Sequence, residues 1–307
     1  DLRQRLGFSP SGGVRVVNAE GDGLPGLVID LYATTVAIQF HHPWVERYRE
    51  VICSFALNSL DATTVVDRSQ RAARAREGLS QSQDVMVGSY DAHPVIREHG
   101  VAYLVDVRNG QKTGFYLDQR ANRALLARWA NGRRVLDLYA HTGGFGLAAL
   151  HAGARHVTFV ESGSAAVDLL RENLSLNGIE AERWSVVRAD VGEFLAAAPG
   201  SYGLVIMDPP PMARRKAHVV NALRGMAGQL ADAFRCAEPG ALLSLFSCSH
   251  HLAQPELDAL IASIAATAGR RIRVLQGMSA DADHPSSAEH PEGRYLVGSL
   301  MHIEGPE

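Results

Sequence analysis

The stretch VLDLYAHTGGFG, residues 135–146, decides the fold of this chain. Its first half is an apolar run typical of a buried strand, and its second half is a glycine-rich turn that leads into a helical pattern. Glycines at a strand-to-helix turn allow the backbone to approach a ligand closely, at the carboxyl end of the strands, where open α/β sheets bind their ligands. The turn alone is equally compatible with a dinucleotide.

Strands and helical stretches alternate from this turn almost to the end of the chain, which predicts βαβ units and a parallel sheet. We predict strands at residues 134–138, 156–160, 185–188, 203–207, 241–247, 271–275 and 295–302, and helices that begin near Gly143, Ser164, Val191, Ala217 and Pro255. A polar loop without a convincing helix joins the last two strands, so we expect an antiparallel terminal strand. The predicted fold class is therefore α/β, with a doubly wound, Rossmann-like sheet.

The residues before this sheet have a different pattern. Short β-like runs at residues 14–17 and 35–40 and a helical stretch at 43–59 predict a smaller N-terminal α+β domain over residues 1–100. Residues 101–116 then alternate, and the Asn109-Gly110 pair predicts a hairpin turn, so we take 101–118 as a β-hairpin connector. The second domain is predicted to cover residues 119–307.

Composition places the chain among ordinary globular proteins, since 46% of its residues are hydrophobic and 21% are charged. No apolar run approaches the ~20 residues that span a bilayer, and we expect a cytoplasmic protein with no membrane partner. The three cysteines are far apart and predict neither a disulfide framework nor a metal site. The net charge of −3 argues against nucleic-acid binding by bulk electrostatics and leaves local patches. Three basic clusters are either such patches or solvated faces: Arg68, Arg71, Arg74 and Arg76; Arg214, Arg215 and Lys216; and Arg270, Arg271 and Arg273.

Acidic residues lie near the ends of the first three predicted strands. Asp137 belongs to the first strand, Glu161 ends the second and Asp190 follows the third. Because the carboxyl ends of parallel strands meet at one edge of a sheet, these acids point toward one crevice. They suit a cofactor with a ribose, an adenine amino group and a cationic sulfonium, although Asp190 is equally suited to cap a helix.

The segment after the fourth strand, Asp208-Pro209-Pro210-Pro211, is the more discriminating element. Prolines fix the backbone and make a rigid wall, against which a planar base can offer its edge to Asp208. The fifth strand brings Cys248 to the same edge. A thiolate is the group that activates carbon 5 of a pyrimidine, by adding to carbon 6. A cysteine on an apolar strand is more often a buried hydrophobe, and His250 and His251 weakly suggest a metal instead.

Seven motifs in order resemble the RlmI-like family of cytosine-5 methyltransferases that act on large-subunit ribosomal RNA. They are residues 16–30, the hairpin segment 110–120, Thr142-Gly143-Gly144-Phe145, Asp208-Pro209-Pro210, Phe246-Ser247-Cys248-Ser249, Asp283-His284-Pro285 and residues 291–295. The family's N-terminal RNA-binding (PUA) domain would precede residue 1. The chain also departs from the family at Pro211 and Met212, and at residues 226–229, where basic and aromatic groups are replaced, so the RNA target is open.

The resemblance implies S-adenosyl-L-methionine as cofactor, RNA as substrate and Cys248 as nucleophile, with Asp208 beside it. It also implies that Tyr116, Gln119 and Arg120 help to enclose the cofactor. With these, the predicted cofactor-binding residues are Asp137, Tyr139, Thr142, Gly143, Gly144, Phe145, Glu161, Ser162, Asp190 and Asp208. Whether the chain acts as a monomer or a homodimer is open.

Three other interpretations remain. The methyl group could go to a nitrogen, with Cys248 structural; the chain could be a non-catalytic RNA-binding or assembly factor; or, least in keeping with Asp208-Pro209-Pro210 and the thiol, it could be a nicotinamide oxidoreductase.

Overall fold

The computed structural model describes residues 2–81, 84–90, 92–197, 200–211, 219–249 and 252–304. Met212, the basic cluster of Arg214, Arg215 and Lys216, and the pair His250 and His251 lie outside these residues. The chain divides into two units. The first comprises residues 1–120 and 281–293, and the second comprises residues 121–280 and 294–307. No helix in the described part of the chain is long and apolar enough to cross a membrane.

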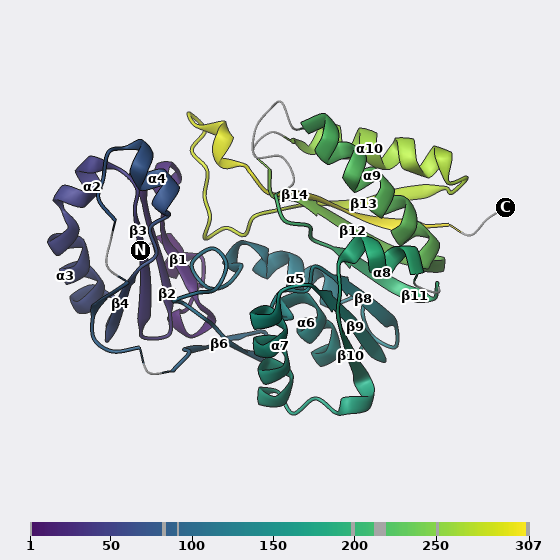
Figure 1. The fold of residues 1–307 in the computed structure, drawn as a ribbon, viewed down its shortest axis with the longest axis horizontal. Helices are drawn as coiled ribbons and strands as arrows, with labels where there is room; N and C mark the ends of the chain where they lie inside the picture. Colours follow the sequence, from purple (N-terminus) through teal and green to yellow (C-terminus); the bar gives the residue numbers. More distant parts are fainter. Residues whose placement is uncertain are drawn as a thin grey trace. The chain divides into compact units, whose positions relative to one another are not determined.

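The first unit is built on a five-stranded sheet with helices packed against it (Figure 1). Its strands, in the order they take across the sheet, are β1 (Val14–Asn18), β2 (Leu27–Tyr32), β3 (Thr35–Phe40), β4 (Thr64–Asp67) and β5 (Val85–Val87). Its helices are α1 (Leu2–Arg5), α2 (Pro43–Arg47), α3 (Arg49–Ser59) and α4 (Arg71–Arg76). Only β3 and β4 pair in parallel, because α2 and α3 form the crossover between them. The predicted α+β character is confirmed.

A hairpin does follow this sheet, but its turn is not at the predicted Asn109-Gly110 pair. Strand β6 (Val95–Glu98) pairs antiparallel with β7 (Val101–Leu104). The turn between them is formed by His99 and Gly100, whose φ angles of 49° and 89° are those of a two-residue hairpin turn. The prediction of a hairpin around Asn109 and Gly110 was wrong.

The side chain of Asp106 explains what happens at residues 108–110 instead. Its Oδ1 accepts hydrogen bonds from the backbone N–H groups of Arg108 (3.1 Å) and Asn109 (2.9 Å). The N–H of Gly110 donates to the carbonyl of Asp106 at 2.9 Å, which closes a tight helical turn. These local bonds use the backbone groups that a second hairpin strand would need for pairing.

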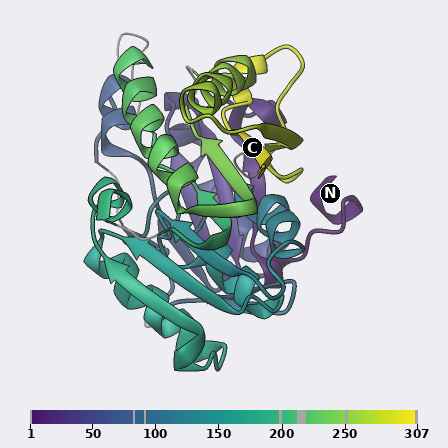
Figure 2. The ribbon, with the colours of Figure 1, turned by 90° about the vertical axis from the view of Figure 1, so that its right-hand side faces the viewer.

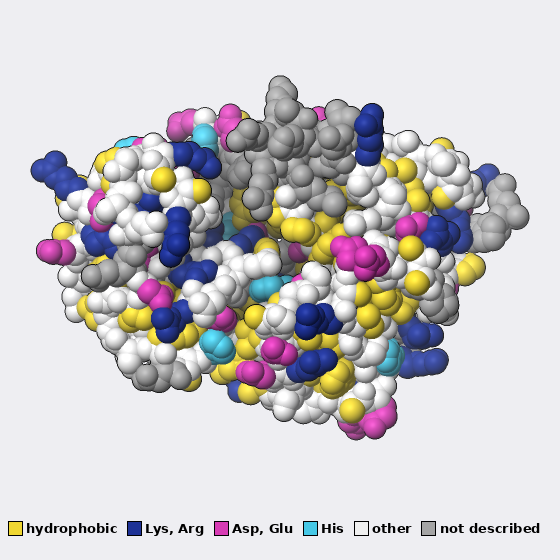
Figure 3. All heavy atoms as spheres, viewed as in Figure 1, with side chains coloured by type: hydrophobic (Ala, Val, Ile, Leu, Met, Phe, Trp, Pro, Cys, Tyr) yellow, Lys and Arg dark blue, Asp and Glu magenta, His cyan; other side chains and the backbone are white. Residues whose placement is uncertain are grey.

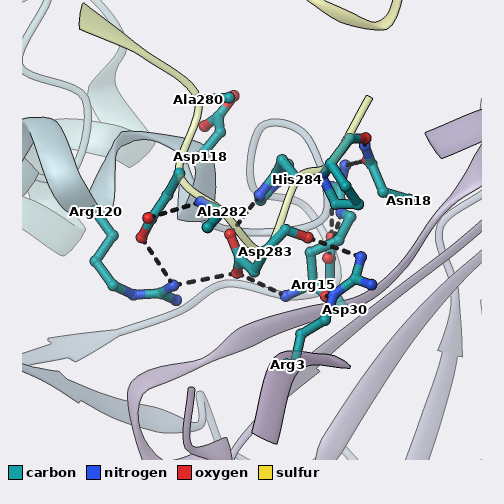
Figure 4. Close-up of polar contacts among 12 residues, drawn as sticks. Arg3, Arg15, Asn18, Asp30, Asp118, Arg120, Ala280, Ala282, Asp283 and His284 are labelled. Carbon is teal, nitrogen blue, oxygen red and sulfur yellow. Dashed lines mark hydrogen bonds and ion pairs between the residues drawn. The ribbon is translucent and has the colours of Figure 1, made fainter. Parts of the chain in front are cut away.

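Residues 281–293, expected within the second domain, belong to the first unit because Asp283 is bonded into it (Figure 4). Its Oδ2 accepts hydrogen bonds from the backbone N–H of Arg15 (3.0 Å) and from the Arg120 guanidinium (3.1 Å). Its Oδ1 lies 2.6 Å from Nδ1 of His284. The Asp283 side chain is fully buried, so these bonds satisfy a carboxylate that water does not reach.

The second unit is a seven-stranded sheet covered by helices. Across the sheet the strands are β10 (Trp184–Arg188), β9 (His156–Glu161), β8 (Arg134–Leu138), β11 (Tyr202–Met207), β12 (Ala237–Ser247), β14 (Val297–Ile303) and β13 (Ile272–Ser279). The helices are α5 (Arg120–Ala127), α6 (Gly144–His151), α7 (Ser164–Leu176), α8 (Val191–Ala197), α9 (Val219–Cys236) and α10 (Gln254–Thr267). The predicted doubly wound α/β class is confirmed, and all seven predicted strands are present, although β12 begins four residues earlier and β13 ends four residues later than predicted.

Helices cover both faces of this sheet, as Figures 1 and 2 show. Helices α6 and α7 pack on β8, β9 and β10, while α9 contacts both α8 and α10, and these three helices contact β12, β9 and β14 respectively. The main core of the unit lies under the second group, where Leu230, Phe234 and Leu257 are buried against the strands. Because helices cover both faces of the sheet, residues 202–207 of β11 are all buried. A strand buried on both faces is a continuous apolar run in the sequence.

The terminal strands confirm the predicted antiparallel addition. Strand β14 lies between β12 and β13 and is antiparallel to both. The five strands from β10 to β12 are parallel, so their carboxyl ends share one edge.

Candidate active site

Predicted site residues gather at the shared carboxyl edge of β8, β9, β10, β11 and β12. Asp137 is in β8, Glu161 is the last residue of β9, and Asp208 and Cys248 directly follow β11 and β12. Asp190 follows β10 by two residues. The parallel register, in which Met207 lies opposite both Leu138 and Leu245, brings the ends of the three central strands level.

The loop between β8 and α6 has an unusual backbone. Tyr139 and His141 have φ angles of 60° and 48°, and Gly143 has φ of 87°. Left-handed conformations at non-glycine residues cost about 1–3 kcal/mol each and persist only where the surroundings hold them. Here the N–H of His141 donates to Glu161 Oε2 at 2.9 Å, and the side-chain amide of Asn173 donates to the Thr142 carbonyl at 3.0 Å.

Asp137 lies beneath this loop and is 1% exposed. Its Oδ2 accepts a hydrogen bond from the backbone N–H of Gly146 at 2.8 Å. Burial, together with the charges of Asp208 and Glu161, raises the pKa of Asp137 to about 8, although the hydrogen bond from Gly146 opposes the shift. Gly146 must be glycine, because a Cβ there would lie 2.1 Å from the Phe159 ring.

Glu161 braces the loop through both carboxylate oxygens. In addition to the bond from His141, its Oε1 accepts the N–H of Gly163 at 2.7 Å. Burial lowers the pKa of His141 to about 4, although the Glu161 charge opposes the shift, so the imidazole is neutral at pH 7. Ser162, which lies between Glu161 and Gly163 in the sequence, is exposed.

Asp190 caps helix α8. Its Oδ1 accepts hydrogen bonds from the N–H groups of Gly192 (2.7 Å) and Glu193 (3.1 Å). The helix-cap interpretation therefore holds for one oxygen of this exposed carboxylate, and its contribution to cofactor binding stays a prediction.

Asp208 and Cys248 come from neighbouring parallel strands. The sulfur of Cys248 lies 4.0 Å from Oδ1 of Asp208. Cys248 is half-buried, whereas Cys53 and Cys236 are buried and their pKa values are raised by burial. Of the three thiols, Cys248 is the one placed to meet a ligand.

Aromatic residues support the same edge. The ring of Phe145 stacks on that of Phe246, with centroids 5.5 Å apart, and joins the start of α6 to the end of β12. Tyr139 donates a hydrogen bond to Gln229 in α9 at 2.7 Å. Burial raises the pKa of Tyr139 to about 12, so the phenol is protonated.

The charges of this edge fit the expected cofactor. Asp137 keeps its proton at pH 7 because its pKa is raised to about 8, so the negative charge at this edge comes from Glu161, which forms no ion pair with Lys or Arg among the residues described. A cationic sulfonium with ribose hydroxyls is stabilised by such a carboxylate, whereas a pyrophosphate would be repelled.

The other predicted cofactor residues, Tyr116, Gln119 and Arg120, lie in the first unit. Tyr116 contacts Gln111 and Lys112, and Gln119 is buried. Arg120 is bonded to Asp283 and donates to the Gly13 carbonyl. Their role in enclosing the cofactor stays a prediction.

Sequence reasoning missed three residues that hold the loop after β8. They are His141, Asn173 and Gln229. Asn173 and Gln229 meet the loop from positions 31 and 90 residues away from their partners, and no local spacing signals such contacts. His141 lies in the glycine-rich turn after β8, but the sequence does not show that its side chain is buried. Only the structure supplies that observation.

Comparison with known proteins identifies a family and several relatives of this chain. The model of an S-adenosylmethionine-dependent methyltransferase family matches residues 62–253. The chain is 38% identical to ribosomal RNA large subunit methyltransferase I of Aeromonas salmonicida (strain A449), over 94% of this chain and 74% of that protein. It is 35% identical to the protein of that name in Pseudoalteromonas atlantica, over 99% and 77%. The solved structure of SMU.776 in complex with SAH has the same fold, with a TM-score of 0.85 at 21% identity over 98% of this chain and 78% of that one.

Proposed function

Because the chain belongs to the S-adenosylmethionine-dependent methyltransferase family, we propose that it methylates carbon 5 of a cytosine in large-subunit ribosomal RNA. The cofactor is S-adenosylmethionine. Relatives named for methylation of the large ribosomal subunit support the substrate. One observation carries the position and mechanism: the Cys248 sulfur lies 4.0 Å from Asp208 at the carboxyl edge of the sheet.

The chemistry follows from the weakness of carbon 5 as a nucleophile. The Cys248 thiolate adds to carbon 6 of the base, which forms an S–C bond and moves an electron pair to carbon 5. S-adenosylmethionine, when bound, would supply an electrophilic methyl group to the electron pair on carbon 5 and would leave as S-adenosylhomocysteine. Water then accepts the proton of carbon 5, the electron pair of that C–H bond restores the double bond between carbons 5 and 6, and the S–C bond breaks to release the Cys248 thiolate.

Asp208 has a separate task in this proposal. Its carboxylate accepts a hydrogen bond from the exocyclic amine of the cytosine and so aligns carbon 6 with the sulfur. Pro209 and Pro210 limit the freedom of the chain directly after it. The base must leave its stack to reach both groups, which favours an unpaired loop nucleotide.

The test is incubation with methyl-labelled S-adenosylmethionine and total RNA from a strain that lacks the gene, followed by nucleoside analysis. We expect labelled 5-methylcytidine with the wild type and none with Cys248→Ala. Cys236→Ala is the matched control, because it removes a buried thiol of the same unit. Retained label in Cys248→Ala, in a nitrogen-methylated nucleoside, would replace this mechanism with direct transfer to nitrogen; absent label despite cofactor binding would indicate a non-catalytic RNA-binding factor.

A further inference from the structure

The first unit contains a polar cavity of about 450 Å³. Its lining residues come from two stretches of sequence: Asp67, Arg68, Ser69, Gln70, Arg71, Arg74, Ala75, Leu79, Gln81 and Asp84, and then Arg108, Asn109 and Lys112. Five of these side chains are cationic and two are acidic. Lys and Arg side chains also gather on the surface around α4, as Figure 3 shows for the side viewed in Figure 1.

Most of these cations already have carboxylate partners. Arg108 pairs with Asp84 at 2.5 Å, Arg74 pairs with Glu46 at 2.7 Å, and Lys112 pairs with Asp118. Arg68 and Arg71 have no carboxylate partner within the described ranges. The acidic residue Asp67, for its part, is paired with Arg49 at 2.7 Å. The cavity wall therefore carries excess positive charge at Arg68 and Arg71.

Arg68 is held in place without being neutralised. Its Nη2 donates to the backbone carbonyls of Gly110 and Lys112. Its Nε is buried and has no hydrogen-bond partner among the residues described. The guanidinium thus keeps its full charge at the cavity wall, and a bound anion would offset that charge.

We propose that this cavity binds one nucleotide of the RNA substrate through its phosphate, with Arg68 and Arg71 as the phosphate ligands. This rests on the proposed RNA substrate. The volume exceeds what a phosphate ion needs and matches that of small-molecule sites. Polar groups of Ser69, Gln70 and Asn109 line the cavity beside the apolar side chain of Leu79, which suits a ribose and base next to the phosphate.

The test measures binding of fluorescently labelled large-subunit RNA fragments to the full chain, by anisotropy over a series of salt concentrations. Arg71→Gln is the main variant, because Arg71 is exposed and we expect its loss to leave the fold intact. We expect affinity to fall about 3- to 10-fold and the slope of log Kd against log salt to decrease by about 0.7–0.9. Arg71→Lys should retain most of the affinity.

Arg76→Gln is the matched control, since Arg76 is an exposed cation of the same helix that does not line the cavity. It should change affinity less than about twofold. Equal losses in Arg71→Gln and Arg76→Gln would overturn the proposal. The proposal would also be overturned if Arg71→Gln weakened the binding of AMP but left the affinity for RNA unchanged. The site would then bind a free nucleotide.

Binding is measured without turnover, and all variants are repeated in the Cys248→Ala background. A failure of the proposed methylation would leave the RNA-binding difference between Arg71→Gln and Arg76→Gln intact. A failure of the proposed phosphate site would leave methylation by the wild type intact.

Discussion

The sulfur of Cys248 lies 4.0 Å from Oδ1 of Asp208, although 40 residues separate them in the chain. The contact exists because β11 and β12 are parallel neighbours in register, with Met207 opposite Leu245. Each side chain follows its strand at the same edge of the sheet. A thiol and a carboxylate this close can act on two atoms of one planar base.

Replacing Asp208 should separate chemistry from cofactor binding. Asp208→Asn keeps the shape of the side chain but presents a weaker acceptor to the base, so we expect methyl transfer to RNA to slow by about 10²- to 10³-fold. The Kd for S-adenosylmethionine, measured by calorimetry, should change less than tenfold. An unchanged single-turnover rate would remove Asp208 from the mechanism.

Glu161 should matter for cofactor affinity. Glu161→Gln removes the negative charge that we assign to the ribose hydroxyls, and a hydrogen bond to a charged group contributes about 1.5–3 kcal/mol. We therefore expect the Kd for S-adenosylmethionine or SAH to rise about 10- to 100-fold. Glu182→Gln changes an exposed glutamate of the same unit and serves as control. Equal Kd values for the two variants would contradict the assignment.

Asp137 should make stability depend on pH. Its pKa is raised from 3.8 to about 8 by burial, so at intermediate pH the folded state holds a proton that the unfolded state has lost. Its contribution is full below pH 4 and is lost as pH rises through 8. Asp137→Asn stays neutral, so the stability of the variant relative to wild type should increase over this range. Urea unfolding at several pH values tests this, and a constant difference would mean that Asp137 is ionised in the fold.

Asp283 should show the opposite dependence. Burial alone raises its pKa, but the hydrogen bond from His284 and the Arg120 guanidinium outweigh burial and lower the pKa from 3.8 to about 2. Its contribution is therefore present above pH 4 and lost as pH falls toward 2. Because Asp283→Asn leaves Arg120 with weaker pairing, we expect a loss of about 3 kcal/mol in unfolding free energy at pH 7, which shrinks in acid.

The control for Asp283 is Arg273→Ala, which breaks the ion pair between Arg273 and Glu304. The Arg273 side chain is 73% exposed, so its loss should cost less than about 1 kcal/mol. If the two variants unfold at the same urea concentration, the buried pair of Arg120 and Asp283 does not stabilise the first unit.

Much of the site was predictable from local signals. The strands that end at Leu138, Glu161 and Met207 are apolar runs bounded by turns, and such runs indicate buried strands wherever they pack. Once the strands are parallel, the residues that follow them must meet at one edge. The Asn109-Gly110 pair does not form a hairpin turn for a local reason. The Asp106 side chain accepts hydrogen bonds from the backbone N–H groups of Arg108 and Asn109, which are then not available for strand pairing.

The sequence by itself determined the α/β class, the approximate strand ends and the residues that follow them. Hydrophobic periodicity, apolar runs and glycine-rich turns indicate local structure over only a few residues, so these features can be recognised without the fold. Only the tertiary structure decided that β14 lies between β12 and β13, that Asp283 is bonded into the first unit, and that Arg68 and Lys112 line one cavity. Those features depend on contacts between residues far apart in the chain. Such contacts are selected by the packing and burial of the whole unit, which no short stretch of sequence specifies.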